Sequence, residues 1–446
     1  MPGDEFWGIT GTGQSVGFSG GSRAGRVESW QGRELAGSRA GRVESWQGRE
    51  QCGIVRGIRI PNLGSGMVLR FLASILAVFR RVWRVSVRAC CLVLLLSVVA
   101  TVPILQFASL GYMLESASRI SRGLPLRSCF PGSETARKIV LSGFFLALSW
   151  LPVWLVADWG YSAELMDPGS AFALRIRVSA RVLAFLWVVW SGWALFRGGR
   201  WYHFLWPAPK RFLKTVFRPD AWRQLEDRLW DLVVSLRIAY LMKIGFYASI
   251  GALFWLLIPA VLIIVALNGG TGTPSDGSNP EGVLGLMGLV GAISMWWVLQ
   301  KLPFLQIHMV NQGKLRAILD GAAIRSAFRR APWAFCIATV VLALLSIPLY
   351  PLRIESIPSQ LRWGLALFFV LFMFPTKLLA GWALRRSLKR TQSVHWFWRW
   401  IAWVPMVGSI AIYVGFLYLA KFALWEGAAS ILLQHAFLPP VPFYLR

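Results

Sequence analysis

Eight long apolar runs occupy the chain after residue 88, and they limit its possible folds more than any other feature. Each is close to the roughly 20 residues that a helix needs to cross the hydrocarbon core of a bilayer. There, every backbone N–H and C=O must be satisfied within the protein, which favours helices. The sequence therefore predicts an all-α integral membrane protein of about eight transmembrane helices. The expected spans are 89–110, 138–157, 179–197, 240–267, 283–300, 331–350, 361–384 and 400–424.

Three short segments recur in the same order in the two halves of the chain. They are VPILQ (102–106) with LPFLQ (302–306), LALSWLPVW (146–154) with LALLSIPLY (342–350), and GWAL (192–195) with GWAL (381–384). Ordered matches of this kind indicate an internal duplication. We expect two parallel repeats of four spans, because an even number of spans gives both halves the same orientation. The first repeat covers 67–267 and the second 283–446, joined by an extracytoplasmic linker loop at 268–282.

The composition agrees with a membrane location and argues against nucleic acid as a partner. Hydrophobic residues make up 56% of the chain, and charged residues only 15%, against about a quarter in soluble domains. The net charge of +27 comes mainly from Lys and Arg beside the apolar runs. Anionic lipid headgroups attract basic residues in that position. We therefore expect membrane lipids as partners through the basic loops, and no nucleic acid.

The basic residues also predict an orientation. Alternate loops carry 26 Lys and Arg, whereas the intervening loops carry four. Under the positive-inside rule the basic loops are cytoplasmic, which suits a bacterial inner membrane. Residues 67–88 do not fit, because their five arginines precede the first span on the opposite side. Either they form an amphipathic helix on the membrane surface, or Pro103 breaks the first span and tilts 107–120 into the interface. Both alternatives remain open at this stage.

The first 66 residues differ from the rest. The 14-residue segment GSRAGRVESWQGRE at 21–34 returns unchanged at 37–50. The region is rich in Gly, Arg and Ser and lacks apolar periodicity, so we expect it to be disordered. The perfect repeat also suggests a recent DNA duplication. We therefore hypothesise that translation starts at Met67 and that 1–66 is an incorrectly assigned extension, which the intact mass of the native protein would test.

Three polar residues inside apolar runs are candidates for lining a cavity between the repeats: Gln106, Gln306 and Lys377. The two glutamines occupy equivalent repeat positions, and Gln300 lies near the second. Glutamine at membrane depth favours a hydrogen-bond partner on another helix. A lysine there usually faces a bundle interior. The alternatives are capping at the helix ends for the glutamines and, for Lys377, a side chain that extends toward the cytoplasmic interface.

No catalytic or metal site is evident, so we expect no enzymatic activity, metal or cofactor. The four His and five Cys show no ligand spacing. A G-x-S-x-G match at 13–17 has no preceding strand, which a nucleophile elbow requires. Glu115 is spaced to pair with Arg119 within a helix. The run HWFWRW at 395–400 reads as an aromatic belt with a basic anchor at the membrane interface.

Leu110-Gly111-Tyr112-Met113-Leu114, followed by Arg119, Arg122-Gly123 and Leu124-Pro125, resembles a motif of uncharacterised prokaryotic multipass membrane proteins. Those families, classed as domains of unknown function, carry a Gly-Tyr segment, a basic helix and a Leu-Pro pair after the first span. The resemblance covers about residues 89–160 and implies a multipass bacterial inner-membrane protein, with no activity attached. The second repeat departs from it, with Met309-Val310-Asn311-Gln312-Gly313 in place of the Gly-Tyr segment.

Two functions are compatible with these observations. One is a small-solute or lipid transporter whose site lies between the two repeats, near Gln106, Gln306 and Lys377. The other is a non-enzymatic membrane scaffold or assembly factor that binds anionic lipid or a cytoplasmic partner through its basic loops. A transporter needs polar groups facing a cavity, whereas a scaffold has a tightly packed apolar interior.

Overall fold

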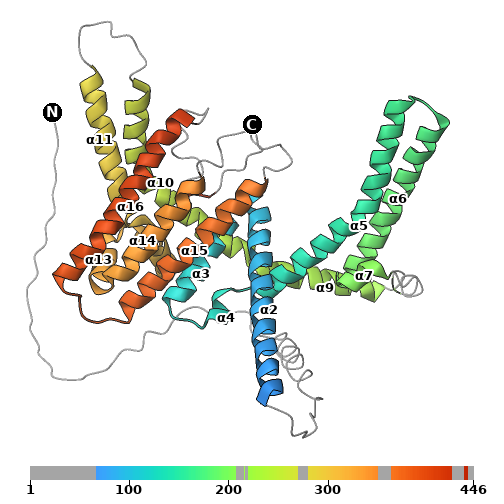
Figure 1. Ribbon diagram of the computed structural model, residues 1–446, viewed down its shortest axis with the longest axis horizontal. Helices are drawn as coiled ribbons and strands as arrows, with labels where there is room; N and C mark the ends of the chain where they lie inside the picture. The colour runs from blue at the N-terminus through green and yellow to red at the C-terminus, as the bar shows by residue number, and fades with distance from the viewer. Residues whose placement is uncertain are drawn as a thin grey trace, which may run out of the picture. The chain divides into compact units, whose positions relative to one another are not determined.

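The computed structural model describes residues 67–206, 215, 219–269, 280–349, 363–423 and 436–439. Within them, all regular structure is helical (Figure 1). The expectations for 1–66 and for most of the 268–282 loop lie outside these residues. The chain divides into two units, Met1–Ser74 and Ile75–Arg446, and the described part of the first is the start of α2.

Among the described residues, seven helices are long and apolar enough to cross a membrane, one fewer than the sequence predicted. The missing one is the span expected at 179–197, which falls on α6. Helix α6 carries Arg175, Arg177 and Arg181 in its N-terminal half. The elements are α2 (Met67–Thr101), α3 (Gln106–Ser121), α4 (Leu126–Cys129), α5 (Ser133–Met166), α6 (Ala171–Phe196), α7 (Trp201–Leu205), α9 (Pro219–Leu236), α10 (Ile238–Gly269), α11 (Pro280–Leu299), α12 (Leu302–Gln312), η2 (Leu315–Leu319), α13 (Gly321–Arg330), α14 (Pro332–Ser346), η3 (Ile347–Leu349), α15 (Trp363–Leu388) and α16 (Trp396–Ala423).

The first predicted span is also corrected, because it is not one helix. Helix α2 ends at Thr101 and α3 begins at Gln106. Pro103 has no N–H to continue the helical hydrogen bonds. The amide of Leu105 instead donates to the carbonyl of Pro103 at 2.9 Å, and Ile104 adopts φ +72°. The candidate span is therefore Ala73–Thr101, and it includes most of the arginine-rich segment 67–88. Of the two open alternatives, the break at Pro103 is present, but the residues after it form the buried helix α3 and not an interfacial segment.

Helix α3 lies at the centre of the packing. Thirteen of its sixteen residues are buried, and it packs against α10, α15 and α12. Glycines allow the close approach to α10: a Cβ on Gly111 would lie 2.0 Å from the carbonyl oxygen of Leu241. Small residues at helix crossings let backbones pack closely in membranes. Helices α14, α15 and α16 lie beside one another in the same assembly (Figure 1).

Helices α5 and α6 form an antiparallel pair that also contacts α7. The indole N–H of Trp187 donates to Ser149 Oγ at 3.0 Å between the two long helices. Only 6% of the apolar stretch of α5 is buried within the chain, against 56% for both α14 and α15. The pair therefore contributes little to the buried core, which is formed mainly by α3, α10, α11, α12, α14, α15 and α16.

Candidate functional site

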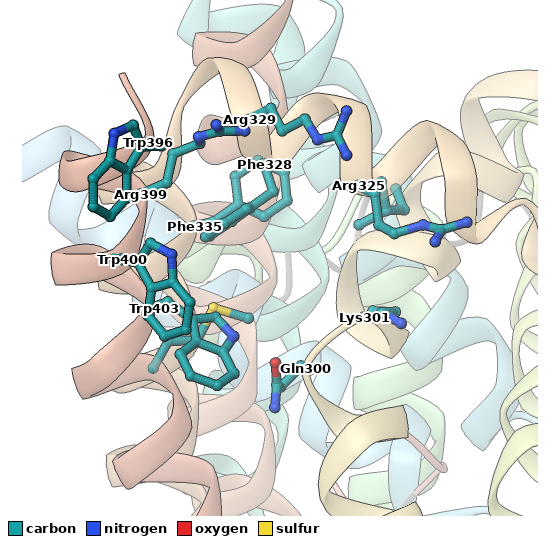
Figure 2. Close-up of a pocket in the computed structure, with 12 residues that line it drawn as sticks. Gln300, Lys301, Arg325, Phe328, Arg329, Phe335, Trp396, Arg399, Trp400 and Trp403 are labelled. Atoms are coloured by element: carbon teal, nitrogen blue, oxygen red, sulfur yellow. The ribbon is translucent and has the colours of Figure 1, made fainter. Parts of the chain in front are cut away.

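A cavity of about 450 Å³ lies where α13, α14 and α16 meet the α11–α12 junction. This volume is in the range of small-molecule sites. We call it the basic-aromatic pocket (Figure 2). Its lining consists of Gln300, Lys301, Ile324, Arg325, Phe328, Arg329, Phe335, Trp396, Arg399, Trp400, Trp403 and Met406.

Two hydrogen bonds hold the elements around this pocket. The indole N–H of Trp296 on α11 donates to the carbonyl of Val407 on α16 at 3.2 Å. The amide of Val394, in the loop before α16, donates to the carbonyl of Arg329 on α13 at 2.9 Å. Helix α13 itself begins at a cap, where the carboxylate of Asp320 accepts from the amide of Ala323 at 3.0 Å. Elements that are distant in sequence are therefore joined around the pocket by hydrogen bonds to backbone carbonyls.

One wall is aromatic. Trp396, Trp400 and Trp403 are four and three residues apart, so they share one face of α16, as Figure 2 shows. The rings of Trp400 and Trp403 meet edge to face with centroids 5.4 Å apart. On the opposite elements, the rings of Phe328 and Phe335 are also edge to face, at 6.0 Å. Such a wall offers apolar area to the tail of a ligand.

The charged residues of the lining are all basic, and the lining contains no carboxylate. Its four cations are Lys301, Arg325, Arg329 and Arg399. Among the ion pairs of the described residues, none involves any of these four side chains. Asp320, the nearest acid in sequence to α13, caps that helix and lies 3.6 Å from Nε2 of His308. The positive charge of the pocket is therefore not balanced by the described part of the chain.

Two buried donors in the pocket have no hydrogen-bond partner among the described residues: Gln300 Nε2 and Arg399 Nε. Gln300 is only 7% exposed. A buried donor without an acceptor costs about 1–3 kcal/mol, and more when it is charged. Both groups donate and neither accepts, so a ligand that satisfies them must bring acceptor oxygens.

Lys301 lies at the edge of the pocket, where two effects disfavour its charged form and one contact favours it. Burial and then the nearby charge of Arg325 lower the pKa of Lys301 to about 8. The ring of Trp297 faces the ammonium with its centroid 3.1 Å from Nζ, and this contact favours the charged form. Figure 2 shows Lys301 and Arg325 on the side of the pocket away from the three tryptophans. A bound anion would stabilise the protonated lysine.

The structure brings together two of the three residues predicted to line a cavity. Lys377 Nζ donates to Gln306 Oε1 at 2.9 Å, and both side chains are fully buried. Gln306 Nε2 in turn donates to the carbonyls of Ala248 at 3.3 Å and Phe437 at 3.0 Å. The ring of Phe437 lies 4.7 Å from Lys377 Nζ. Neither residue is part of the basic-aromatic pocket.

Gln106, the third predicted residue, lies elsewhere. It begins α3, is half-buried, and its Oε1 is a buried acceptor without a partner among the described residues. The described hydrogen bonds of Gln306 and Lys377 do not include it. The two glutamines also differ in local structure, because Gln106 follows the break at Pro103 whereas Gln306 lies within α12.

A second polar cluster connects α3 with α10 and α12. The predicted ion pair of Glu115 and Arg119 is present at 2.7 Å, and Tyr240 donates to the same carboxylate at 3.4 Å. Asn311 of α12 exchanges hydrogen bonds with Ser121, and Ser118 donates to it at 2.8 Å. A cavity of about 140 Å³ lies beside Glu115. These groups satisfy one another, so the cluster explains helix packing without a ligand.

A third cavity, of about 740 Å³ between α11 and α16, is lined mainly by apolar side chains and has no charged group. It offers contact area but no specific polar recognition, so the basic-aromatic pocket remains the best-supported site. Sequence reasoning described Trp396, Arg399 and Trp400 only as an interface anchor and mentioned Gln300 only as a neighbour of Gln306. The available signal was the position of the HWFWRW run after a basic loop.

Comparison with known proteins adds no relative: no family model, no curated protein and no solved structure matches this chain. The protein is a multipass helical membrane protein, and its function must be inferred from its own geometry.

Proposed function

We propose that this protein binds an anionic amphiphile, of the chemical class of acidic phospholipids, in the basic-aromatic pocket. The observation that carries the proposal is the combination in one cavity of a tryptophan wall with four cations and two buried donors that have no ion-pair or acceptor partner within the described part of the chain. Basic pockets between transmembrane helices are a known mode of headgroup recognition. The proposal favours a lipid-binding role over the transport of a small polar solute.

The expected topology supports this assignment. Lys301, Arg325 and Arg329 belong to the basic loop 301–330, and Arg399 ends the basic loop 385–399. If both loops are cytoplasmic, as the distribution of Lys and Arg predicts, the pocket lies at the cytoplasmic leaflet. Tryptophan is enriched at that depth of the membrane. An acidic headgroup would meet the arginines while its chain lies against α16.

The test is lipid binding by full-length protein purified in detergent, followed by native mass spectrometry during titration with phosphatidylglycerol. The variant Arg329→Gln/Arg399→Gln removes two pocket cations. Arg330→Gln/Arg386→Gln removes the same charge from α13 and α15, at positions outside the pocket lining. Each charge-assisted hydrogen bond contributes about 1.5–3 kcal/mol, and about 1.4 kcal/mol is tenfold in affinity.

We therefore expect at least about tenfold weaker binding for the pocket variant and little change for the control. Equal losses in both variants would show that lipid is attracted by general surface charge. Phosphatidylcholine serves as the neutral reference, and equal affinity for it would also contradict the proposal.

Transport through the interior is the second candidate function. Its support is the buried pair of Lys377 and Gln306, which joins α12 to α15, with no described ion pair at the lysine. An ionisable group within the membrane usually marks a functional pathway. Gently purified protein should then retain a small polar solute, and Lys377→Leu should lose it. Retention of lipid alone, equal in wild type and variant, would remove this candidate.

A further inference from the structure

The charge of the pocket specifies more than a general preference for acidic lipid. We infer that its ligand is a lipid phosphomonoester, whose headgroup carries two negative charges, and not a phosphodiester with one. This inference rests on the proposed function and defines its ligand class. It follows from three observations: the number of cations, the number of donors that need acceptors, and the shape of the apolar wall.

The first observation is charge balance. Lys301, Arg325, Arg329 and Arg399 line one cavity, and neither its lining nor the described ion pairs supply a carboxylate to any of them. A phosphodiester would leave three positive charges unbalanced. A phosphomonoester, whose second pKa is near 6, carries about −1.5 to −2 at pH 7. The charge of Arg325 is close enough to Lys301 to add to the effect of burial in lowering the pKa of that lysine.

The second observation is donor count. Gln300 Nε2 and Arg399 Nε are buried donors that find no acceptor among the described residues, and the remaining guanidinium and ammonium groups add further N–H groups. A phosphomonoester presents three terminal oxygens, which suits bidentate arginine contacts and leaves an acceptor for an amide. A phosphodiester presents two. The third terminal oxygen adds acceptor capacity for the arginines, the lysine and the buried glutamine together.

The third observation concerns the tail. Trp396, Trp400 and Trp403 extend over two turns of α16, and Met406 continues the same lining. This wall lies beside the cations, so one molecule can contact both. A free phosphate monoester shares the headgroup chemistry but would leave the aromatic wall unused. The structure therefore favours a phosphomonoester attached to a hydrocarbon chain.

The experiment compares phosphatidic acid with phosphatidylglycerol of identical chains at pH 7.5, using the full-length protein in detergent. Glycerol 3-phosphate serves as the headgroup without a tail. We expect phosphatidic acid to bind at least about tenfold more tightly than phosphatidylglycerol, which corresponds to about 1.4 kcal/mol. Arg329→Gln should reduce that preference, whereas Arg330→Gln, one residue away and outside the lining, should keep it.

The outcomes are separable. Equal affinity for the two lipids would overturn the phosphomonoester inference while leaving the proposed function intact. Binding of neither would overturn both. If glycerol 3-phosphate binds as tightly as phosphatidic acid, the dianion is supported but the lipid tail is contradicted. Trp400→Ala, compared with Trp398→Ala outside the lining, should weaken phosphatidic acid binding without changing that of glycerol 3-phosphate.

Discussion

Lys377 and Gln306 are joined by a 2.9 Å hydrogen bond between two fully buried side chains, one from α15 and the other from α12. The Nε2 of Gln306 is held by two backbone carbonyls, so its amide is oriented with Oε1 toward the lysine. Among the described residues, Gln306 Oε1 is the atom that accepts a hydrogen bond from Lys377 Nζ. The arrangement connects α10, α12, α15 and the segment that contains Phe437.

Gln306→Leu should destabilise the protein by about 3 kcal/mol, since it leaves a buried nitrogen of Lys377 without an acceptor. Lys377→Met should cost less, because Gln306 keeps both backbone bonds and loses only a donor to Oε1. The double variant should be less destabilised than the sum of the two single changes, as expected for residues in contact. Chemical unfolding in detergent measures all three. Additive effects would show that the two residues do not act as a pair.

This pair illustrates what the sequence can predict. A lysine in an apolar run predicts an interior position, and glutamine at membrane depth predicts a partner on another helix. Neither rule identifies the partner. The repeat suggested that Gln106 and Gln306 would act together, but the break at Pro103 gives Gln106 a different local structure. VPILQ and LPFLQ are similar in sequence, but VPILQ follows the end of α2 whereas LPFLQ begins α12.

Gly245→Ala should destabilise the packing of α3 on α10. A Cβ at this position would lie 1.8 Å from the carbonyl oxygen of Phe107, so the helices must separate. We expect a loss of about 2–3 kcal/mol, typical of overpacking at a close contact. Gly415→Ala on α16 is the control, because its Cβ would meet nothing within 4 Å. That change should be neutral or slightly stabilising, since Ala favours helix over Gly.

The pocket shows where prediction from sequence stops. The aromatic and basic character of 395–400 is visible in the sequence, and its place at a membrane interface follows from it. The segment 395–400 lies near Arg329 because the amide of Val394 donates a hydrogen bond to the carbonyl of Arg329 at the end of α13. Such a contact connects residues 65 positions apart, and no local pattern encodes it.

Gln300→Leu separates binding from stability. Because Gln300 Nε2 is buried and has no acceptor in the described structure, removing it should leave the free energy of unfolding unchanged or increase it by up to about 1 kcal/mol. The same change should weaken phosphatidic acid binding about fivefold, through the loss of one hydrogen bond of about 1 kcal/mol. Thermal unfolding and lipid titration measure the two quantities. A substantial loss of stability would show that Gln300 is a structural residue.

Binding of phosphatidylglycerol should weaken as the pH rises from 7 to 9.5, because Lys301, with a pKa of about 8, loses its proton in that interval. The charge of this lipid does not change over the same range. The stability of the ligand-free protein should change in the opposite direction and increase as the pH rises. The unfolded chain, with an ordinary lysine pKa of about 10.4, binds more protons between pH 8 and 10.4, so stability rises with pH there.

Lys301→Arg is the decisive comparison for this pH dependence. Arginine keeps its charge across the whole range, so binding by this variant should be nearly independent of pH. Lys301→Met should bind about tenfold more weakly at pH 7 and should also show no transition near pH 8. If wild type and Lys301→Arg lose affinity together as the pH rises, another group controls binding. In that case the ammonium of Lys301 does not contact the headgroup.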